Sequence, residues 1–214
     1  MTVGSGEASP GIRVGIDFDN TLIDYDRVFL KTARQRGLID PSFQGSKREV
    51  RDAIRLLPDG ELSWQRLQGY VYGAGIDGAV LFPGAGEFLR RCRELRRDVV
   101  IVSHKTRYGH LDPMRVDLRQ AALDWMEAQG FFRPDGIGLT RQQVFFEETR
   151  AAKLARIAAL ECTHFIDDLE EVFTDPDFPA GVRRILFADA STGCAAVVCP
   201  AWRNVATVVL GVPR

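Results

Sequence analysis

The sequence has no long apolar run and none of the features of a secreted or membrane-bound chain. None of its hydrophobic stretches approaches the roughly 20 residues that a transmembrane helix needs. Residues 1–10 are small and polar and lack the apolar centre of a signal peptide. We therefore expect a cytoplasmic protein without a membrane partner, in which residues 1–10 form a flexible tail.

Cysteine is also scarce, and its spacing argues against a zinc site or a redox pair. The 214 residues contain four cysteines and three histidines. No C-x-x-C pair occurs and the histidines are equally scattered, so the usual zinc ligands are not grouped. We expect free thiols, as in a reducing compartment, at Cys92, Cys162, Cys194 and Cys199.

Neither sign of charge is in excess. The chain has 28 Lys and Arg against 29 Asp and Glu, a formal net charge of −1. Because no basic patch interleaved with aromatic residues occurs, we expect no nucleic-acid partner. The length slightly exceeds that of one typical domain, which favours a core domain with a small insert.

Strand-like and helix-like segments alternate through most of the chain. This alternation predicts an α/β fold with a mainly parallel sheet. The predicted helices span residues 84–97, 113–129 and 150–160, from apolar spacing and from Pro and Gly at their ends. The predicted strands span residues 12–18, 98–103, 144–146, 163–166 and 182–188.

Residues 24–80 break this alternation. Three helices are predicted there, over residues 26–36, 47–57 and 62–72, with no strand between them. The segment therefore reads as a helical insert placed directly after the first strand.

Two aspartates end the first predicted strand at a spacing of two residues. Asp17 and Asp19 follow an apolar run, and Thr21 comes directly after them. Residues i and i+2 of an extended segment point the same way, so both carboxylates can face the carboxyl edge of the sheet, where α/β proteins bind ligands. Two such carboxylates repel each other unless a cation lies nearby. The pattern indicates a nucleophile, an acid–base group and a divalent cation such as Mg²⁺.

Two further side chains suit the binding of phosphate. Ser103 ends an apolar strand, where its hydroxyl can donate to a phosphate oxygen. Lys153 lies near the start of a predicted helix, where it can offset negative charge, with Arg150 and Arg156 as alternatives.

A second acidic pair follows another strand. Asp167 and Asp168 come directly after residues 163–166. Adjacent residues at a strand end point apart, so one carboxylate can face a metal while the other supports it.

In this order, the features resemble the motifs of the haloacid dehalogenase (HAD) superfamily, most of whose members are Mg²⁺-dependent phosphohydrolases. Asp17-Phe18-Asp19-Asn20-Thr21 is similar to the first motif, D-x-D-x-T. Ser103, Lys153 and the adjacent Asp167 and Asp168 stand where the other three motifs are expected.

The resemblance covers nearly the whole chain and implies its organisation. It implies a Rossmann-like parallel sheet with helices on both faces, in a core of residues 11–23 and 81–214. Residues 24–80 stand in the position of a C1-type cap, a small all-helical domain that closes over the active site. Residues 200–205 are similar to a terminal tryptophan-containing helix of such proteins, and we expect Trp202 to pack in the core.

The resemblance also implies residue roles. Asp17 would be the nucleophile that forms an aspartyl-phosphate, and Asp19 the general acid and base. Mg²⁺ would be bound at Asp17, Asp19 (through its main-chain carbonyl) and Asp168, with Asp167 as the supporting partner. The phosphate-binding residues would be Ser103, Lys153, Thr21 and His104.

The substrate is expected to be a small phosphorylated metabolite, with a sugar phosphate preferred. Lys105, Arg107 and Tyr25 are candidates to contact it, although a solvated loop accounts equally well for the polar residues after Ser103. An acid at Asp19 argues against a dehalogenase, whose leaving group needs no proton. A phosphosugar mutase and a non-catalytic phosphate-binding or regulatory module are the alternatives.

Overall fold

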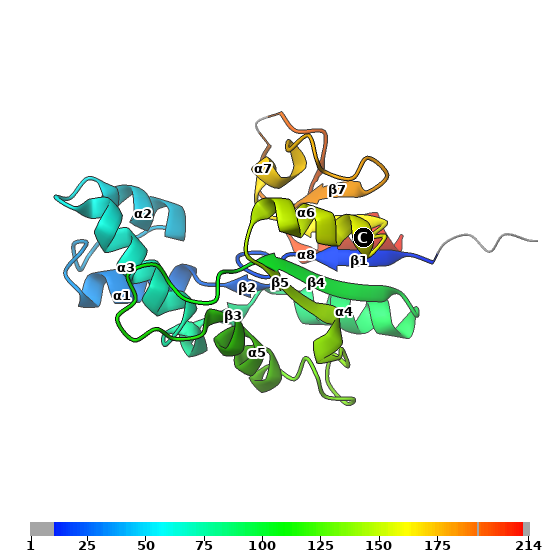
Figure 1. Ribbon diagram of the computed structural model, residues 1–214, viewed down its shortest axis with the longest axis horizontal. Helices are drawn as coiled ribbons and strands as arrows, with labels where there is room; N and C mark the ends of the chain where they lie inside the picture. Colours follow the sequence, from blue (N-terminus) through cyan, green and yellow to red (C-terminus); the bar gives the residue numbers. More distant parts are fainter. Residues whose placement is uncertain (1–10, 192, 212–214) are drawn as a thin grey trace, which may run out of the picture.

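A six-stranded, fully parallel sheet forms the centre of the molecule (Figure 1). The computed structural model describes residues 11–191 and 193–211, so the predicted tail at residues 1–10 lies outside the described residues. The strand order is β5-β4-β1-β6-β7-β8. The strands are β1 (Arg13–Ile16), β4 (Asp98–His104), β5 (Val144–Glu147), β6 (His164–Asp167), β7 (Arg183–Leu186) and β8 (Val197–Val198).

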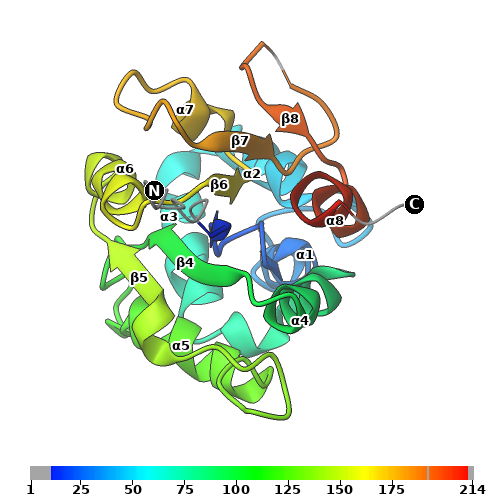
Figure 2. The same cartoon turned by 90° about the vertical axis from the view of Figure 1, so that its right-hand side faces the viewer.

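Helices cover both faces of this sheet, which confirms the predicted α/β class. Figure 2 shows α4, α5 and α8 on one side of the strands and α6 on the other. Alternate residues of β4 explain the two layers, because Val99 and Ile101 pack in one core cluster while Val100 and Val102 pack in the other. The helices are α4 (Ala85–Glu94), α5 (Leu118–Ala128), α6 (Arg150–Ala159), α7 (Glu170–Phe173) and α8 (Trp202–Leu210).

Three helices lie apart from the sheet, at the left of Figure 1. They are α1 (Asp26–Gln35), α2 (Lys47–Arg55) and α3 (Gly60–Tyr72), and a 3₁₀ turn at Ile76–Gly78 follows them. The two short strands that flank this helical insert, β2 (Ile23–Asp24) and β3 (Val80–Leu81), pair antiparallel. Neither strand is predicted from the sequence, because two residues are too few to show a period-two pattern. Within the described residues, no helix is long and apolar enough to cross a membrane.

The predicted helix over residues 113–129 begins later than expected. It begins at Leu118 because the Asp117 side chain accepts hydrogen bonds from the backbone N–H groups of Arg119 and Gln120. Pro113 lies instead in a loop that Asp112 organises by accepting from the backbone N–H of Met114. Pro113 predicts a helix start, but the capping aspartate determines where the helix begins.

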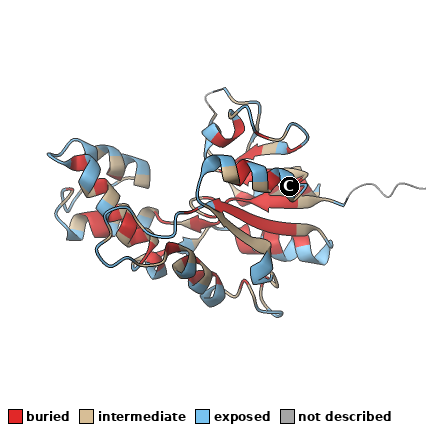
Figure 3. Ribbon diagram, in the orientation of Figure 1, coloured by how far each residue is buried: buried red, intermediate tan, exposed pale blue. Residues whose placement is uncertain are grey.

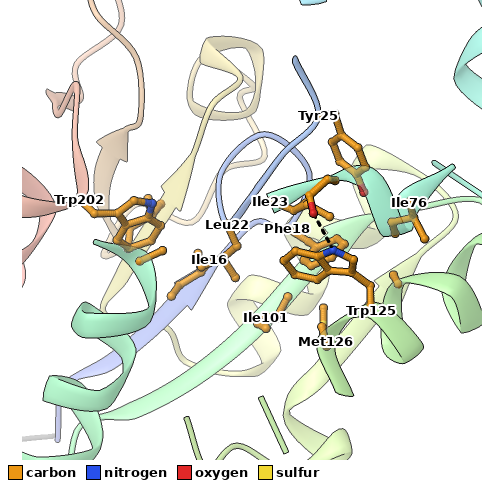
Figure 4. Close-up of a cluster of buried hydrophobic side chains, with 14 of the residues drawn as sticks. Ile16, Phe18, Leu22, Ile23, Tyr25, Ile76, Ile101, Trp125, Met126 and Trp202 are labelled. Carbon is orange, nitrogen blue, oxygen red and sulfur yellow. Dashed lines mark hydrogen bonds between the residues drawn. The ribbon is translucent and has the colours of Figure 1, made fainter. Parts of the chain in front are cut away.

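The core extends directly under the end of β1. In Figure 3 the central strands β1 and β4 are mostly buried, as expected for parallel strands covered on both faces. Figure 4 shows Phe18 against Trp125, with ring centroids 5.7 Å apart. On the other side, buried Trp202 donates its indole N–H to the carbonyl of Thr21 over 3.1 Å. These contacts anchor the loop that carries the first two aspartates.

Candidate active site

A tight turn after β1 sets the direction of Asp17 and Asp19. The backbone N–H of Asp17 donates to the Ile166 carbonyl over 2.9 Å, which joins β1 to β6. The chain then folds back, and the carbonyl of Phe18 accepts from the N–H groups of Leu22 and Ile23. Asn20 has φ 57°, a left-handed conformation that asparagine tolerates better than most residues. The turn therefore holds both carboxylates at the carboxyl edge of the sheet.

Lys153 joins the two acidic motifs. Its Nζ donates to Asp17 Oδ1 over 2.6 Å and to Asp167 Oδ2 over 2.7 Å, and all three side chains are buried. Lys153 lies in the first turn of α6, which Thr149 caps by accepting from the N–H of Ala152. Burial alone would lower the pKa of Lys153, but the Asp167 and Asp17 carboxylates raise it, so the ammonium stays charged.

The environment of Asp17 calls for a further cation. Burial, with repulsion from Asp167 and Asp19, raises the pKa of Asp17 to about 7 despite the opposing effect of Lys153. Burial, with repulsion from Asp167 and Asp17, raises the pKa of Asp168 well above its ordinary value. Carboxylates that resist ionisation in this way gain most from a bound metal ion.

Three carboxylates fit a divalent cation. One oxygen each of Asp17, Asp167 and Asp168 lie within 4.8 Å of one another. Asp167 already accepts from Lys153 and, through Oδ1, from the N–H of Leu169 over 2.9 Å. The Asp168 carboxylate accepts no hydrogen bond within the part of the chain that the structure describes, so both of its oxygens are available to a metal. Hard carboxylate oxygens are the ligands that Mg²⁺ prefers.

The Asp19 carboxylate lies outside that acidic group and is held by other partners. Tyr25 donates its hydroxyl to Asp19 Oδ1 over 2.8 Å. Lys105 Nζ lies 3.1 Å from Oδ1 and 2.8 Å from Oδ2 of the same carboxylate. Tyr25 is fully buried, and burial together with Asp19 raises its pKa well above 10.0. Tyr25 and Lys105, which the sequence suggested as substrate contacts, are therefore bonded to Asp19.

Two buried hydroxyls, one in the turn after β1 and one on β4, lack partners among the described residues. Ser103 ends the buried part of β4 and is 1% exposed, and Thr21 is fully buried. Within residues 11–191 and 193–211, neither side-chain oxygen forms a hydrogen bond. A buried hydroxyl without a partner is costly, so each is available to donate to a ligand oxygen.

Two predicted site residues point elsewhere. His104 follows Ser103 on β4 and is exposed, as the alternation of side chains along a strand requires. Its Nε2 lies 3.0 Å from the carbonyl oxygen of Glu148. Arg107 is exposed as well and donates to Asp117 Oδ2 over 2.8 Å. Both side chains thus have partners other than Asp17, Asp167 and Asp168, the three residues of the acidic cluster.

Sequence reasoning overlooked Lys47. This residue is the first of α2. Ser46 and Glu49 form a capping box around it, so the local sequence is that of an ordinary helix start. The fold places its ammonium over the rings of Phe29 and Tyr72, facing the acidic cluster. No sequence signal could have found it, because its surroundings come from three different helices.

Comparison with known proteins identifies the fold. No protein-family model matches the sequence, and neither does any curated protein. A subfamily IA HAD-superfamily hydrolase from Geobacter sulfurreducens is 13% identical, with a TM-score of 0.57, and the match covers 94% of this chain and 99% of that one. Protein Tyrosine Kinase A of Mycobacterium tuberculosis is 14% identical, with a TM-score of 0.62 and coverage of 93% and 98%. A HAD-family hydrolase from Deinococcus radiodurans R1, solved with bound phosphate and sodium, is 15% identical, with a TM-score of 0.52 and coverage of 95% and 97%.

These similarities confirm the predicted resemblance at the level of the fold. The architecture is that of HAD-superfamily hydrolases, and it extends over nearly the whole chain. One fold can serve several activities, as the name of the mycobacterial neighbour illustrates. The activity must therefore be argued from the site.

Proposed function

We propose that the protein is a Mg²⁺-dependent phosphohydrolase that acts on a small phosphorylated metabolite, preferably a sugar phosphate, through an aspartyl-phosphate. One observation carries this proposal. A carboxylate at the end of β1, Asp17, is bonded to a buried lysine, and a second carboxylate two residues on, Asp19, is held by separate donors. The two acids thus have different environments, which suits a nucleophile beside an acid–base group.

In the first step, a carboxylate oxygen of Asp17 attacks phosphorus while the bond from phosphorus to the ester oxygen breaks. Asp19 gives its proton to that leaving oxygen. Asp19 then takes a proton from water, whose oxygen attacks the aspartyl-phosphate, so inorganic phosphate leaves and the Asp17 carboxylate is restored. Tyr25 and Lys105 keep Asp19 in place through both steps.

Other side chains supply charge and hydrogen bonds. Lys153 and the free hydroxyl of Ser103 would donate to the non-bridging phosphate oxygens, as could Thr21. Asp17 and Asp168, with Asp167 beside them, would hold Mg²⁺. A bound Mg²⁺ offsets the repulsion between an anionic nucleophile and an anionic phosphoryl group.

The proton donor favours ester cleavage over cleavage of a carbon–halogen bond. A halide leaves as a stable anion, whereas an alkoxide needs a proton. In this structure two donors, Tyr25 and Lys105, are devoted to orienting Asp19. An acid–base group oriented in this way suits a reaction in which the leaving group must be protonated.

We also propose that residues 24–80 act as a cap over a core formed by residues 11–23 and 81–214. Tyr25, the residue before α1, contacts Asp19 directly, and Lys47 of α2 faces the same cluster. An insert that reaches the reacting groups can exclude water and select small substrates.

The test is inorganic phosphate release from a panel of sugar phosphates, nucleotides and small phosphoesters. We expect turnover that requires Mg²⁺, stops with EDTA and falls at least about 10³-fold in Asp17→Asn, because the nucleophile is lost. Asp177→Asn, the same change at an exposed carboxylate, should leave the rate unaltered. A folded, Mg²⁺-binding protein that releases no phosphate from any compound would overturn the proposal, and isomerised phosphosugar without phosphate would indicate a mutase.

A further inference from the structure

Lys47 is a half-buried cation without an ionic partner. Its Nζ lies 5.5 Å from the ring centroid of Phe29 and 5.5 Å from that of Tyr72. In the described part of the chain it forms no ion pair. Aromatic faces stabilise an ammonium, but less than the water it has lost or a carboxylate would. The site therefore holds a positive charge that is not neutralised by a direct contact.

Tyr72 lies next to the two side chains that hold Asp19, the proposed acid–base group. The Tyr72 ring also lies 5.0 Å from Lys105 Nζ, and Lys105 is bonded to Asp19. Tyr72 packs on Tyr25 with centroids 4.9 Å apart, and Tyr25 donates to Asp19 as well. Tyr72 thus connects Lys47, on the side that the helical insert forms, to both side chains that hold Asp19.

Lys47 stays protonated in this position. Burial lowers its pKa, but Tyr72 and the carboxylates of Asp168 and Asp19 raise it more, so the net shift is upward. A cation close to both the proposed metal ligand and the proposed acid lies within the reaction site rather than on the outer surface of the insert.

The two buried lysines near the site already have carboxylate partners. Lys153 is paired with Asp17 and Asp167, and Lys105 with Asp19. Lys47, in contrast, forms no ion pair with a described residue. An anionic ligand can therefore bind Lys47 without breaking an existing ion pair. Desolvated charge-assisted bonds of this kind are the strong ones.

We propose that Lys47 determines substrate specificity by binding a second anionic group, a carboxylate or a second phosphate, on the leaving part of the phosphoester. The inference rests on the proposed function and deepens it. Because Asp19 must reach the leaving oxygen, a neighbour of Asp19 on the insert contacts the leaving part rather than the phosphoryl group. Among sugar phosphates and related metabolites, the preferred substrates are then those that carry a second acidic group, such as phosphorylated sugar acids or sugar bisphosphates. Phosphoesters with a neutral leaving part bind less well.

Equilibrium binding measurements test the proposed role of Lys47 without turnover of the substrate. Calorimetry would use the Asp17→Asn protein with Mg²⁺ and three ligands: glycerol 3-phosphate, 3-phosphoglycerate and glycerol 1,3-bisphosphate. The first two differ only by an alcohol in place of a carboxylate, and the third carries a second phosphate instead. We expect one or both of the ligands with an anionic tail to bind about 10- to 100-fold more tightly than glycerol 3-phosphate, as a charge-assisted bond provides.

Three further variants of the Asp17→Asn protein test whether Lys47 causes this difference in affinity. Lys47→Met should remove most of it, and Lys47→Arg should retain most of it, because the charge remains. Arg48→Met, which removes the adjacent exposed cation of α2, should leave the ratio of affinities unchanged. Circular dichroism would show that each variant is folded, and the arginine variant keeps the test valid if the methionine variant is not.

The proposal is overturned if the parent binds the three ligands equally or not at all. It is also overturned if Lys47→Met weakens all three alike, since Lys47 would then contact the phosphoryl group. Failure of the proposed hydrolysis is a separate result: phosphate release could be absent while the affinity ratio still depends on Lys47, or present while it does not.

Discussion

At the scale of single residues, the charged part of the candidate site consists of four carboxylates and the two lysines paired with them, and this pairing explains the chemistry proposed for each. Lys153 takes two carboxylates, Asp17 and Asp167, while Asp168 is left for a metal. Buried charges persist only when other charges or metals compensate them. The acidic cluster is therefore expected to gain stability from a divalent cation.

Mg²⁺ should raise the thermal unfolding midpoint of the protein, because an ion that binds only the folded state stabilises that state, by an amount that grows with the logarithm of the ion concentration above Kd. Asp168→Asn should remove most of that increase by replacing a charged ligand with a weaker neutral oxygen. Differential scanning fluorimetry, with and without millimolar Mg²⁺, measures both. Asp177→Asn serves as the control. An equal shift in the Asp168→Asn protein would show that the ion binds elsewhere.

At the scale of elements, the helical insert is pressed against the loop between β4 and α5. A Cβ added to Gly109 of this loop would lie 2.7 Å from the Cα of Gly69 in α3. Two glycines thus let two backbones approach more closely than any side chain allows. The loop begins at Lys105, so the contact also supports the lysine that holds Asp19.

Gly109→Ala should therefore destabilise the protein by about 1–3 kcal/mol, the usual cost of overpacking a close contact. Urea unfolding followed by circular dichroism gives the difference in the free energy of unfolding. Gly181→Ala is the matched control, because an added Cβ there would meet no atom within 4 Å. Equal effects of the two substitutions would contradict the packing argument.

At the scale of the whole molecule, stability depends on pH partly through His164, at the start of β6. Burial and the neighbouring Arg183 lower the pKa of His164 below its ordinary value of 6.5. The folded protein therefore disfavours the imidazolium. As pH falls below 6.5 the unfolded chain takes up a proton first, so stability falls until the pH reaches the lower pKa of the folded state.

Replacing His164 should remove this loss of stability in acid. We therefore expect the free energy of unfolding of His164→Gln, minus that of the unchanged protein, to rise as the pH falls from 7.5 to 5. The rise should be about 0.5 kcal/mol or less, since solvent screens the half-exposed ring. Urea unfolding at the two pH values measures the difference. A relative stability that stays constant, or falls as the solution is acidified, would contradict the assigned sign.

Much of this architecture could be predicted from sequence because its signals are local. The apolar runs of β1, β4 and β6 each indicate a buried strand, and a parallel sheet then brings Asp17, Ser103 and Asp167 to one edge. The predicted start of α5 at Pro113 was wrong, because the side chain of Asp117 caps the helix further along the chain. The strands β2, β3 and β8 were missed because each has only two residues.

Sequence by itself determined the α/β class, the position of the helical insert and the spacing of Asp17 and Asp19, since all three follow from periodicity along the chain. Only the tertiary structure decided which groups those carboxylates meet. Lys153 reaches Asp17 across 136 residues of sequence, and Lys105 reaches Asp19 across 86. Lys47 became part of the site only through the packing of α1, α2 and α3. Contacts between segments so far apart depend on the complete fold, so no local pattern could encode them.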